Sequence, residues 1–445
     1  MLDAPDQLGT QPVGRLLWWA CSQTTLSVGV YGIYALTNAW FVARGVGATA
    51  LAAVNLVAPL LLLLGAVATT VGVGGASVVS RALGRRDPDG AARAAGTAFA
   101  LYWATAIAVT ILGLVFLTPL LELMGATDAT LPDAQAYGTV IIGGAIVATG
   151  FSAIVRAEGR MLFSTMLWVV PVLVQIILDP ILIFGFDLGV VGAGLGTVGG
   201  QAVSASMAAW FFFLRRDRPY RIRLTHLRPH PATVRELIAI GTPSFLAGIG
   251  VTLLAVLVNA TLAAAGAVVL AAYAVCARVQ TFVTMPQTGI AQGMQPIIGF
   301  NAGRFLDDRV ERARVLASRA TLMVGGIAAA VVALGADALV SVFLDDADAA
   351  ASAVTALRII AIGIVVAGIP PLVSVYFQAL GRPAVSYGIS IGSIVAVKIP
   401  LVLTLGLLGP LGVWIALPLG ELMSAAAAWW LLRRDRRRAS LPSEA

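Results

Sequence analysis

The chain has 445 residues, of which 59% are hydrophobic and only 11% charged, and its mean hydropathy is +0.92. So few polar groups cannot cover the surface of a water-soluble domain of this size, so that class is excluded. The net charge of +7 could suggest a nucleic-acid partner. We expect none, because the arginines gather in alternate loops along the chain and not in one patch.

Long apolar runs dominate the sequence. A membrane-spanning helix needs about 20 predominantly apolar residues, and several of the runs are longer, so we expect tilted, kinked or extended helices. The sequence therefore predicts an all-α integral membrane protein with twelve transmembrane helices. The runs lie near 16–42, 49–80, 94–121, 136–155, 161–186, 190–214, 237–261, 267–300, 315–343, 355–380, 384–408 and 411–432.

The loops between the runs alternate in charge. Arginines fill one set, whereas the intervening loops are acidic or neutral and hold residues such as Glu122, Asp128, Asp187 and Asp337. The positive-inside rule places the arginine-rich loops and both termini in the cytoplasm. Many arginines with a single lysine, and abundant Ala and Gly, fit a GC-rich bacterial genome. We therefore expect a multi-pass protein of the bacterial cytoplasmic (inner) membrane.

The two halves of the chain repeat each other. A shift of 219 residues lays Gly74 on Gly293, and a shift of 220 lays Pro180 on Pro400. Each half holds six spans, so the copies enter the membrane with the same orientation and form a parallel repeat. We predict a six-helix lobe, a basic cytoplasmic linker and a second six-helix lobe, at 1–214, 215–236 and 237–445. We expect the linker to be solvated and long enough for the lobes to move semi-independently.

Asp179 lies inside the run 161–186, where no charged residue precedes it. A carboxylate at membrane depth costs at least a few kcal/mol unless it is protonated, paired or wetted, so it marks a functional site. Pro180 lacks a backbone N–H and frees the carbonyl of Ile176, and Gln175 lies one turn away on the same face. These features predict a proton or cation site that lines a pathway. The alternative is a structural carboxyl group that is hydrogen-bonded to nearby backbone.

The second half carries basic residues inside its spans. Lys398 is the only lysine of the chain, and it either snorkels, binds backbone carbonyl groups or faces a cavity in the second lobe. For Arg278 in the eighth span, the simpler interpretation is a structural pairing with a carboxylate such as Glu421. We take Lys398 and Arg278, together with Gln201 and Asn259, as candidates for a substrate cavity.

Signals of enzymatic chemistry are missing from the sequence. Lys398 is followed by Ile399, so no Walker A loop exists, and no H-E-x-x-H motif occurs. His226 and His230 have a metal-ligand spacing, but the prolines beside His230 oppose a helix, and we expect both in a solvated linker. Cys21 lies in an apolar run and implies no disulfide framework. The sequence predicts no enzyme, no metal site and no cofactor.

Several stretches carry a recognisable pattern: Phe41-Val42-Ala43-Arg44 through Gly47, Ala50-Leu51-Ala52-Ala53, Gly74-Gly75-Ala76-Ser77 running into Ser80-Arg81-Ala82-Leu83-Gly84, Arg156-Ala157-Glu158-Gly159, and Asp179-Pro180-Ile181-Leu182-Ile183-Phe184 followed by Gly192-Ala193-Gly194, Thr197 and Gln201. With this set the chain resembles the multidrug and toxic compound extrusion (MATE) transporters over essentially its whole length. The resemblance implies twelve helices in two lobes. It also implies efflux of amphipathic, often cationic compounds in exchange for H⁺ or Na⁺.

The resemblance further implies an ion-coupling site in the first lobe. Asp179 and Thr197 match the family pattern, while Gln175 and Ser152 stand where Asn is usual. The acid of the first helix falls at position 38, which is Asn38 here. Because an amide replaces one of two carboxylates, a second acid cannot contribute, so Na⁺ coordination is expected to be poorer.

The sequence therefore predicts a secondary active antiporter of small organic compounds, with Asp179 as its coupling carboxylate and H⁺ or Na⁺ as its coupling ion. We expect it to act as a monomer surrounded by membrane lipid. One alternative is a flippase for lipid-linked precursors, whose cationic cavity Lys398 and Arg278 would supply. A non-transporting membrane scaffold or receptor is the other, and it would show no ion-dependent flux.

Overall fold

The computed structural model describes residues 5–147, 151–344 and 346–439. Within these ranges, twelve helical segments are long and apolar enough to cross a membrane, which confirms the predicted all-helical membrane protein. The chain forms two packing units. Unit 1 consists of Met1–Thr10 and Leu26–Gly241, and unit 2 of Gln11–Thr25 and Thr242–Ala445.

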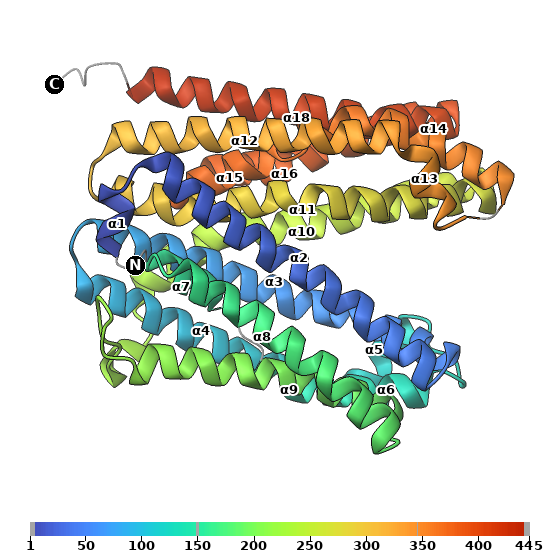
Figure 1. Cartoon of the computed structure of the whole chain (residues 1–445), viewed down its shortest axis with the longest axis horizontal. Coiled ribbons are helices and arrows are strands. Elements are labelled where there is room, and N and C mark those ends of the chain that lie inside the picture. Colours follow the sequence, from blue (N-terminus) through green and yellow to red (C-terminus); the bar gives the residue numbers. More distant parts are fainter. Residues whose placement is uncertain (1–4, 148–150, 345, 440–445) are drawn as a thin grey trace. The chain divides into compact units, whose positions relative to one another are not determined.

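Unit 1 is built around two long helix pairs, α3 with α4 and α8 with α9, and α6 packs against both α3 and α9 (Figure 1). Val42, Tyr137 and Ile183 lie in its apolar core. Three short 3-10 or π segments lie within its spans, and one 3-10 turn lies in the linker. Its helices are α1 Pro5–Thr10, α2 Val13–Gly45 from Leu26 onward, α3 Ala48–Gly84, α4 Pro88–Val115, α5 Leu117–Leu123, α6 Leu131–Gly143, η1 Gly144–Val147, α7 Ser152–Ala157, α8 Met161–Pro180, η2 Ile181–Gly185, α9 Gly189–Ala209, η3 Trp210–Leu214 and η4 Leu224–Leu227.

Unit 2 is organised around α11, which packs against α12, α14 and α15, while α18 packs against α14 and α17. Its core includes Cys276, Leu357 and Trp414. Its helices are α10 Pro231–Ala263 from Thr242 onward, α11 Ala267–Gly303, α12 Asp307–Leu334, α13 Ala336–Ser341, α14 Ala347–Ile364, α15 Ile369–Ala379, α16 Pro383–Gly392, η5 Ser393–Lys398, α17 Ile399–Leu405, η6 Gly406–Leu408 and α18 Pro410–Ala439.

The third and ninth spans begin earlier than their apolar runs. The sequence predicts 94–121 and 315–343, whereas α4 and α12 begin at Pro88 and Asp307 and end at Val115 and Leu334. Each helix opens with polar residues that a hydropathy window leaves out. At the start of α4, the Asp87 side chain accepts a hydrogen bond from the Gly90 N–H at 2.7 Å. This N-cap and the proline at the first helical position fix the earlier start.

The first turns of α2 and α10 pack with the opposite half of the sequence. In unit 2, Thr24 Oγ1 donates to the Gly289 carbonyl at 2.5 Å, and a Cβ on Gly293 would lie 2.8 Å from that same hydroxyl oxygen. In unit 1, a Cβ on Gly74 would lie 2.1 Å from the carbonyl oxygen of Leu237. Gly74 and Gly293 are a pair that the 219-residue shift superposes. The repeated glycine therefore lets a helix start approach closely in each unit.

The linker, residues 215–236, is held on unit 1 by a buried acid. Glu158 is fully buried, and its carboxylate accepts hydrogen bonds from Arg218 Nη2 at 2.5 Å and from the Tyr220 hydroxyl at 2.6 Å. The Arg218 guanidinium also lies over the ring of Phe212, at 4.6 Å from its centroid. Burial and the charge of Glu158 raise the pKa of the Tyr220 hydroxyl, which therefore stays protonated and donates to Glu158.

The rest of the linker is also attached to unit 1. His226 Nε2 lies 3.2 Å from Asp89 Oδ1 on α4, and Glu236 pairs with Arg81 at 2.9 Å. The expected solvated linker is therefore wrong for Arg218, Tyr220 and His226, whereas Arg216, Arg221 and His230 are exposed. A run of arginines suggests a solvated segment, but Arg218 finds a buried carboxylate 60 residues away in the sequence and aromatic rings beside it.

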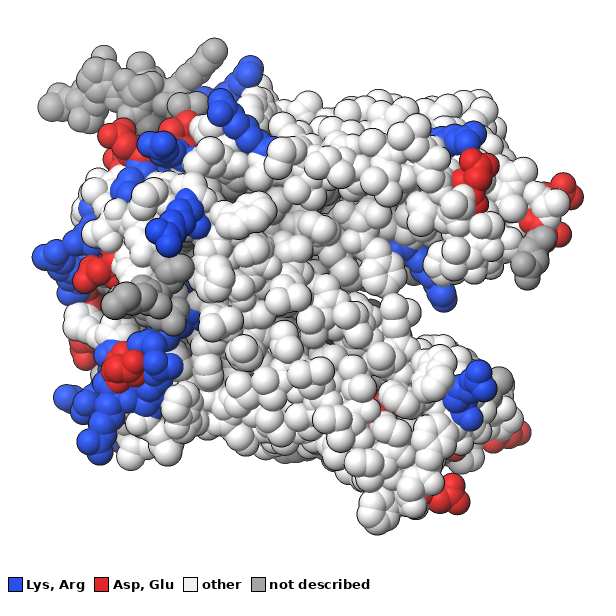
Figure 2. All heavy atoms as spheres, viewed as in Figure 1, with Lys and Arg blue, Asp and Glu red and all other residues white. Residues whose placement is uncertain are grey.

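Charge is unevenly distributed over each unit. In Figure 2, Lys and Arg side chains gather at one end of each unit, and a broad band over the helices carries almost no charge. The hydrocarbon region of a bilayer requires such a band. The distribution matches the alternation of loop charges that the sequence displays.

Candidate functional site

Asp179 lies near the end of α8, fully buried in unit 1, directly before Pro180 and the π-helix η2. Proline cannot donate the hydrogen bond that an α-helix requires at its position, and α geometry gives way to the wider π turn immediately after it. Single π turns within helices are frequent at functional sites. The irregular backbone that the sequence predicts is thus adjacent to the buried acid.

Four of the five predicted ion-site residues lie together. Gln175 Nε2 donates to Asp179 Oδ2 at 3.1 Å. Thr197 Oγ1 lies 3.5 Å from Gln175 Nε2 and 3.5 Å from Asn38 Nδ2, and all four side chains are buried. Gly196 permits this arrangement, because a Cβ there would lie 2.0 Å from Asp179 Oδ1. Helices α2, α8 and α9 therefore contribute to one polar cluster, here called the Asp179 cluster.

Two oxygens of the Asp179 cluster are without a hydrogen-bond partner among the described residues. They are Asp179 Oδ1 and Gln175 Oε1. Among the same residues, no arginine, lysine or histidine forms an ion pair with Asp179. A buried acceptor without a partner costs about 1–3 kcal/mol. The arrangement can relieve this cost by taking up a proton on Asp179 or by coordinating a small cation through both oxygens.

Ser152, the fifth predicted residue, lies in a different network. Its hydroxyl accepts a hydrogen bond from Trp168 Nε1 at 3.0 Å, and its carbonyl accepts one from the Ser164 hydroxyl at 2.9 Å. Trp168 precedes Asp179 by eleven residues in α8, which corresponds to about 16 Å along the helix. No hydrogen bond among the described residues connects Ser152 with the Asp179 cluster.

The equivalent place in unit 2 holds an ion pair. Lys398 Nζ lies 2.6 Å from Glu421 Oε1, and the two side chains are 17% and 15% exposed. A shift of 220 residues lays Leu178 on Lys398 and Gln201 on Glu421, so the pair joins the helices that correspond to α8 and α9. The expected pairing of Arg278 with Glu421 is wrong, because Lys398 is the partner of Glu421. The Arg278 side chain is exposed.

The remaining cavity candidates lie apart from these networks. Gln201 is half-buried and Asn259 is exposed. Within the described part of the chain, no hydrogen bond links Gln201, Asn259 or Arg278 to Asp179 or to Lys398.

Sequence reasoning missed Tyr137 and Gly196. Tyr137, from α6, is fully buried, and its hydroxyl interacts with the Thr197 side chain and lies within electrostatic reach of Asp179. A tyrosine in an apolar run gives no signal of such a contact. Gly196 lies in a glycine-rich stretch, and only the position of Asp179 in space distinguishes it from its neighbours.

Comparisons with known proteins extend over both units. The sequence model of the MatE family matches residues 25–181 and 243–404. The multidrug export protein MepA of Staphylococcus aureus is 30% identical over 430 residues, which cover 93% of this chain and 91% of that protein. MepA of Staphylococcus saprophyticus is 29% identical over 419 residues, covering 91% and 90%. The solved outward-facing conformation of a multidrug resistance MATE family transporter of the MOP superfamily is 25% identical, with a TM-score of 0.89 and coverage of 97% and 98%.

Proposed function

The chain belongs to the MATE family of multidrug efflux transporters, and from this premise we propose that it is a secondary active antiporter that exports small amphipathic, often cationic organic compounds. It is a multi-pass membrane protein. We place it in a bacterial cytoplasmic membrane, with the arginine-rich loops and both termini in the cytoplasm. One chain contains both units, and we propose that it works as a monomer. A non-transporting scaffold does not fit a member of this family.

The observation that supports this proposal is that two oxygens of the Asp179 cluster, Asp179 Oδ1 and Gln175 Oε1, accept no hydrogen bond from any described residue. Asp179 has one hydrogen bond, from Gln175, and no cationic partner among the described residues. In such surroundings neither a permanent cation nor several hydrogen bonds hold the carboxyl group in its charged form, so it is able to gain and lose a proton. We propose that Asp179 is the residue that binds the coupling ion.

The chemistry of the cluster favours H⁺ over Na⁺ as the coupling ion. A proton needs only one oxygen, whereas hard metal cations are held by shells of several oxygen ligands. Asn38 occupies the position of a second acid, and its amide nitrogen faces Thr197. The cluster therefore offers a single negative charge to a cation.

The charge of Asp179 can act on the helix geometry beside it. The carboxyl group is enclosed by Gly196 on α9 and is followed directly by Pro180 and η2. Neutralising the carboxylate removes the need to solvate a buried charge, so the packing of α8 on α9 and the bend after Pro180 can change. We propose that protonation from the outer side favours the conformation that releases the exported compound.

The driving force is sufficient for export. A membrane potential of about 150 mV supplies about 3.5 kcal/mol for each net positive charge that moves inward, as when one proton is exchanged for an uncharged compound. At 1.4 kcal/mol for each tenfold change in concentration ratio, this supports a substrate gradient of about 300-fold. Exchange of one proton for one monovalent cation moves no net charge, so the pH gradient drives it.

A flippase for lipid-linked precursors was the alternative that a cationic cavity would favour. Lys398 does not supply an uncompensated positive charge, because Glu421 lies 2.6 Å away and neutralises it. The pair thus removes part of the basis for an anionic substrate and favours export of organic cations.

The test uses purified chain in proteoliposomes loaded with a fluorescent organic cation such as ethidium. We expect an imposed pH gradient to drive its movement and a sodium gradient alone to drive none. Asp179→Asn should abolish gradient-driven transport, because the amide cannot carry the exchanged proton.

Glu122→Gln is the matched control, since Glu122 is an exposed acid of unit 1 outside the candidate spans. Equal transport by Asp179→Asn and Glu122→Gln would remove Asp179 from the mechanism. Transport driven by sodium at constant pH would overturn the choice of H⁺.

A further inference from the structure

A short pattern of glycine, arginine and aspartate occurs at equivalent places in the two halves of the chain. Gly159-Arg160 directly precedes α8, and Gly381-Arg382 directly precedes α16. Arg215-Arg216-Asp217-Arg218 directly follows η3, and Arg433-Arg434-Asp435-Arg436 lies in the last turns of α18. In each half, the arginine of the first stretch therefore lies at the start of the fifth span, and the aspartate of the second stretch lies at the end of the sixth.

The structure pairs this arginine and this aspartate in the same way in both units. Arg160 Nη2 lies 3.2 Å from Asp217 Oδ2, and Arg382 Nη1 lies 2.8 Å from both carboxylate oxygens of Asp435. The glycine before each arginine has a positive φ, 80° in unit 1 and 72° in unit 2, which glycine adopts without steric cost. The recurrence of the contact and of its turn indicates a shared role, because a chance meeting of surface charges would not recur at both places.

Unit 1 closes this place with a second pair, which is buried. Glu158 lies two residues before Arg160, and its carboxylate binds Arg218, the residue after Asp217. The Arg160 side chain is only 8% exposed, and its guanidinium lies 5.8 Å from the centroid of the Phe211 ring. Separating a buried pair leaves charges without partners, which is costly. The start of α8 is therefore firmly fixed to the linker.

In unit 2 the second pair cannot form. The 222-residue shift lays Glu158 on Leu380, which carries no charge. The Arg382 side chain is 54% exposed, and among the described residues it is the one ion-pair partner of Asp435. An exposed ion pair contributes little to stability and is weakened further by salt. The start of α16 is therefore held to the end of α18 by a contact that can open and close.

The backbone on either side of this contact is irregular. Residues 365–368 separate α14 from α15, and Pro370 and Pro371 have no N–H to donate there. On the other side, α16 changes to the π-helix η5 after ten residues. A Cβ on Gly388 or Gly392 would meet nothing within 4 Å, so close packing does not require these glycines. Glycines and π turns are places where a helix bends readily. The hairpin of α15 and α16 thus lies between two points at which the chain can bend.

Within the hairpin, buried polar side chains join the two helices. Ser374 Oγ on α15 lies 2.5 Å from Ser386 Oγ and 3.1 Å from Ser390 Oγ on α16. Gln378 Nε2 donates to Ser386 Oγ at 3.1 Å and to Ser244 Oγ on α10 at 3.0 Å. The two helices therefore move as one body that stays attached to α10, whereas α16 has little contact with α18.

The fifth span of unit 1 is more rigid. Helix α8 continues for 20 residues before η2 and packs closely along α9. Pro171 lies in its middle, but a Cβ on Gly200 of α9 would lie 2.5 Å from the Pro171 carbonyl oxygen, so α9 supports the helix at that point. The difference between the two units thus extends from the ion pairs to the backbone.

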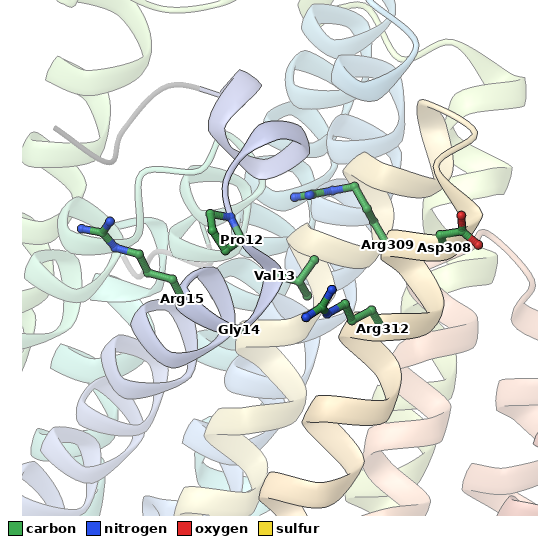
Figure 3. Close-up of a pocket in the computed structure, with 7 residues that line it drawn as sticks. All are labelled: Pro12, Val13, Gly14, Arg15, Asp308, Arg309 and Arg312. Atoms are coloured by element: carbon green, nitrogen blue, oxygen red, sulfur yellow. The ribbon is translucent and has the colours of Figure 1, made fainter.

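The turn between α11 and α12, which the orientation above also places in the cytoplasm, is held more firmly than the turn of the hairpin. Arg309 Nη2 donates to the Gln11 carbonyl at 2.7 Å, and its Nε donates to Asn301 Oδ1 at 2.9 Å. Asn301 is fully buried, and Figure 3 shows the Arg309 side chain reaching toward Pro12. Of these two turns of unit 2, that of the α15–α16 hairpin is therefore the one that can be released.

We propose that the α15–α16 hairpin is a movable cytoplasmic element and that the Arg382–Asp435 pair closes it against α18. The equivalent place of unit 1 stays closed, because the buried Glu158–Arg218 pair holds it. Alternating access requires an opening on the cytoplasmic side, and movement of the hairpin supplies it in unit 2. This role rests on the proposed export function, whereas the movement itself can be measured without transport.

The first experiment measures the movement by distances between two spin labels on the full-length chain in proteoliposomes. The labels are attached to Ala384→Cys and Arg434→Cys, two exposed positions of unit 2, after Cys21 and Cys276 have been replaced by alanine. The repeat supplies the matched control, which is Leu162→Cys with Arg216→Cys at exposed positions of unit 1. We expect a shorter and a longer distance in unit 2 and a single distance in unit 1.

Charge variants then test the pair itself. Asp435→Asn should raise the ratio of the longer to the shorter distance in unit 2 about two- to fivefold, the range for an exposed ion pair. Arg382→Asp/Asp435→Arg should restore the ratio of the unsubstituted pair. Asp217→Asn should leave the distance in unit 1 unchanged, because Glu158 still binds Arg218. A single unchanged distance in unit 2, equal opening of both units, or no rescue by the charge exchange would overturn the proposal.

The second experiment tests whether the movement serves transport. A bifunctional methanethiosulfonate reagent that joins Ala384→Cys to Arg434→Cys should lower ethidium export at least tenfold, and a reductant should restore it. The same treatment of Leu162→Cys/Arg216→Cys should leave export within twofold. Unimpaired export by the cross-linked hairpin would overturn its role in transport. A chain that shows both distances but exports nothing before cross-linking would contradict the proposed function and not the movement.

Discussion

The Asp179 cluster of unit 1 and the Lys398–Glu421 pair of unit 2 occupy corresponding places of the repeat. They differ in whether a cationic side chain compensates the charge of the carboxylate. Among the described residues, Asp179 accepts one hydrogen bond, from the Gln175 amide, and its Oδ1 has no partner. Glu421 is neutralised by an ammonium group 2.6 Å away. Each site lies beside a π-helix and near one of the two prolines that the repeat superposes. Pro180 directly precedes η2, and Pro400 lies two residues after Lys398, the last residue of η5. The same irregular helix geometry therefore lies beside a carboxyl group that we propose changes its charge and beside an ion pair whose charges cancel.

Glu158 extends the comparison, because it is a buried acid of unit 1 that forms an ion pair. Its carboxylate and the Arg218 guanidinium are 0% and 1% exposed. Arg218→Met should lower the free energy of unfolding by about 3–5 kcal/mol, since it leaves a buried charge without its partner. The measurement is the unfolding midpoint in detergent, beside Asp179→Asn, which we expect to change it little. If Arg218→Met were as stable as wild type, burial would not distinguish the two acids.

The Lys398–Glu421 pair should respond in the same way, but more weakly. Its side chains retain some exposure, so we expect Lys398→Met or Glu421→Gln alone to cost about 2–3 kcal/mol, at or below the range for fully buried pairs. Lys398→Met/Glu421→Met should recover most of that loss, because two apolar side chains leave no unpaired charge. A double variant less stable than both single variants would show that the pair does more than cancel its own charges.

Gly196 tests how closely the Asp179 cluster depends on its packing. Gly196→Ala places a methyl group 2.0 Å from the original position of Asp179 Oδ1, so the carboxyl group must move. Overpacking of this kind costs about 1–3 kcal/mol, and we expect gradient-driven efflux to fall at least tenfold. Gly199→Ala, which would meet only the end of the flexible Leu178 side chain, is the matched control and should keep most of the transport rate.

Gln175 should have the smallest effect of the four. Its amide donates the one hydrogen bond that Asp179 accepts from another described side chain, at 3.1 Å, and such a bond favours the charged form of the acid. Gln175→Leu should therefore favour the protonated form and move the pH dependence of efflux upward, with a change of about 0.5–1.5 kcal/mol in free energy. The measurement is the initial transport rate across a pH series. An unchanged profile would mean that the amide only fills space.

The sequence anticipated the membrane class, the number of spans and the part of the Asp179 cluster that depends on local spacing. Gln175 and Asp179 lie on one face of α8 because they are four residues apart, which a sequence displays directly. Thr197 and Asn38 required the family resemblance. The Lys398–Glu421 and Glu158–Arg218 pairs join residues that are 23 and 60 positions apart. No periodicity links such partners, so the sequence alone suggests a solvated linker and does not reveal that Glu421 pairs with Lys398 and not with Arg278.

The packing of the start of α2 has a consequence for the biosynthesis of the protein. Thr24 and its partner Gly289 are separated by 265 residues. At about 5–20 residues per second, the ribosome needs about 13–53 s to add that length of chain. During this time the earliest turns of the nascent transporter have no native neighbours in unit 2. Helix α2 therefore reaches its final packing only after the second half of the chain has been inserted, and the glycine-lined surface that receives it must remain free until then.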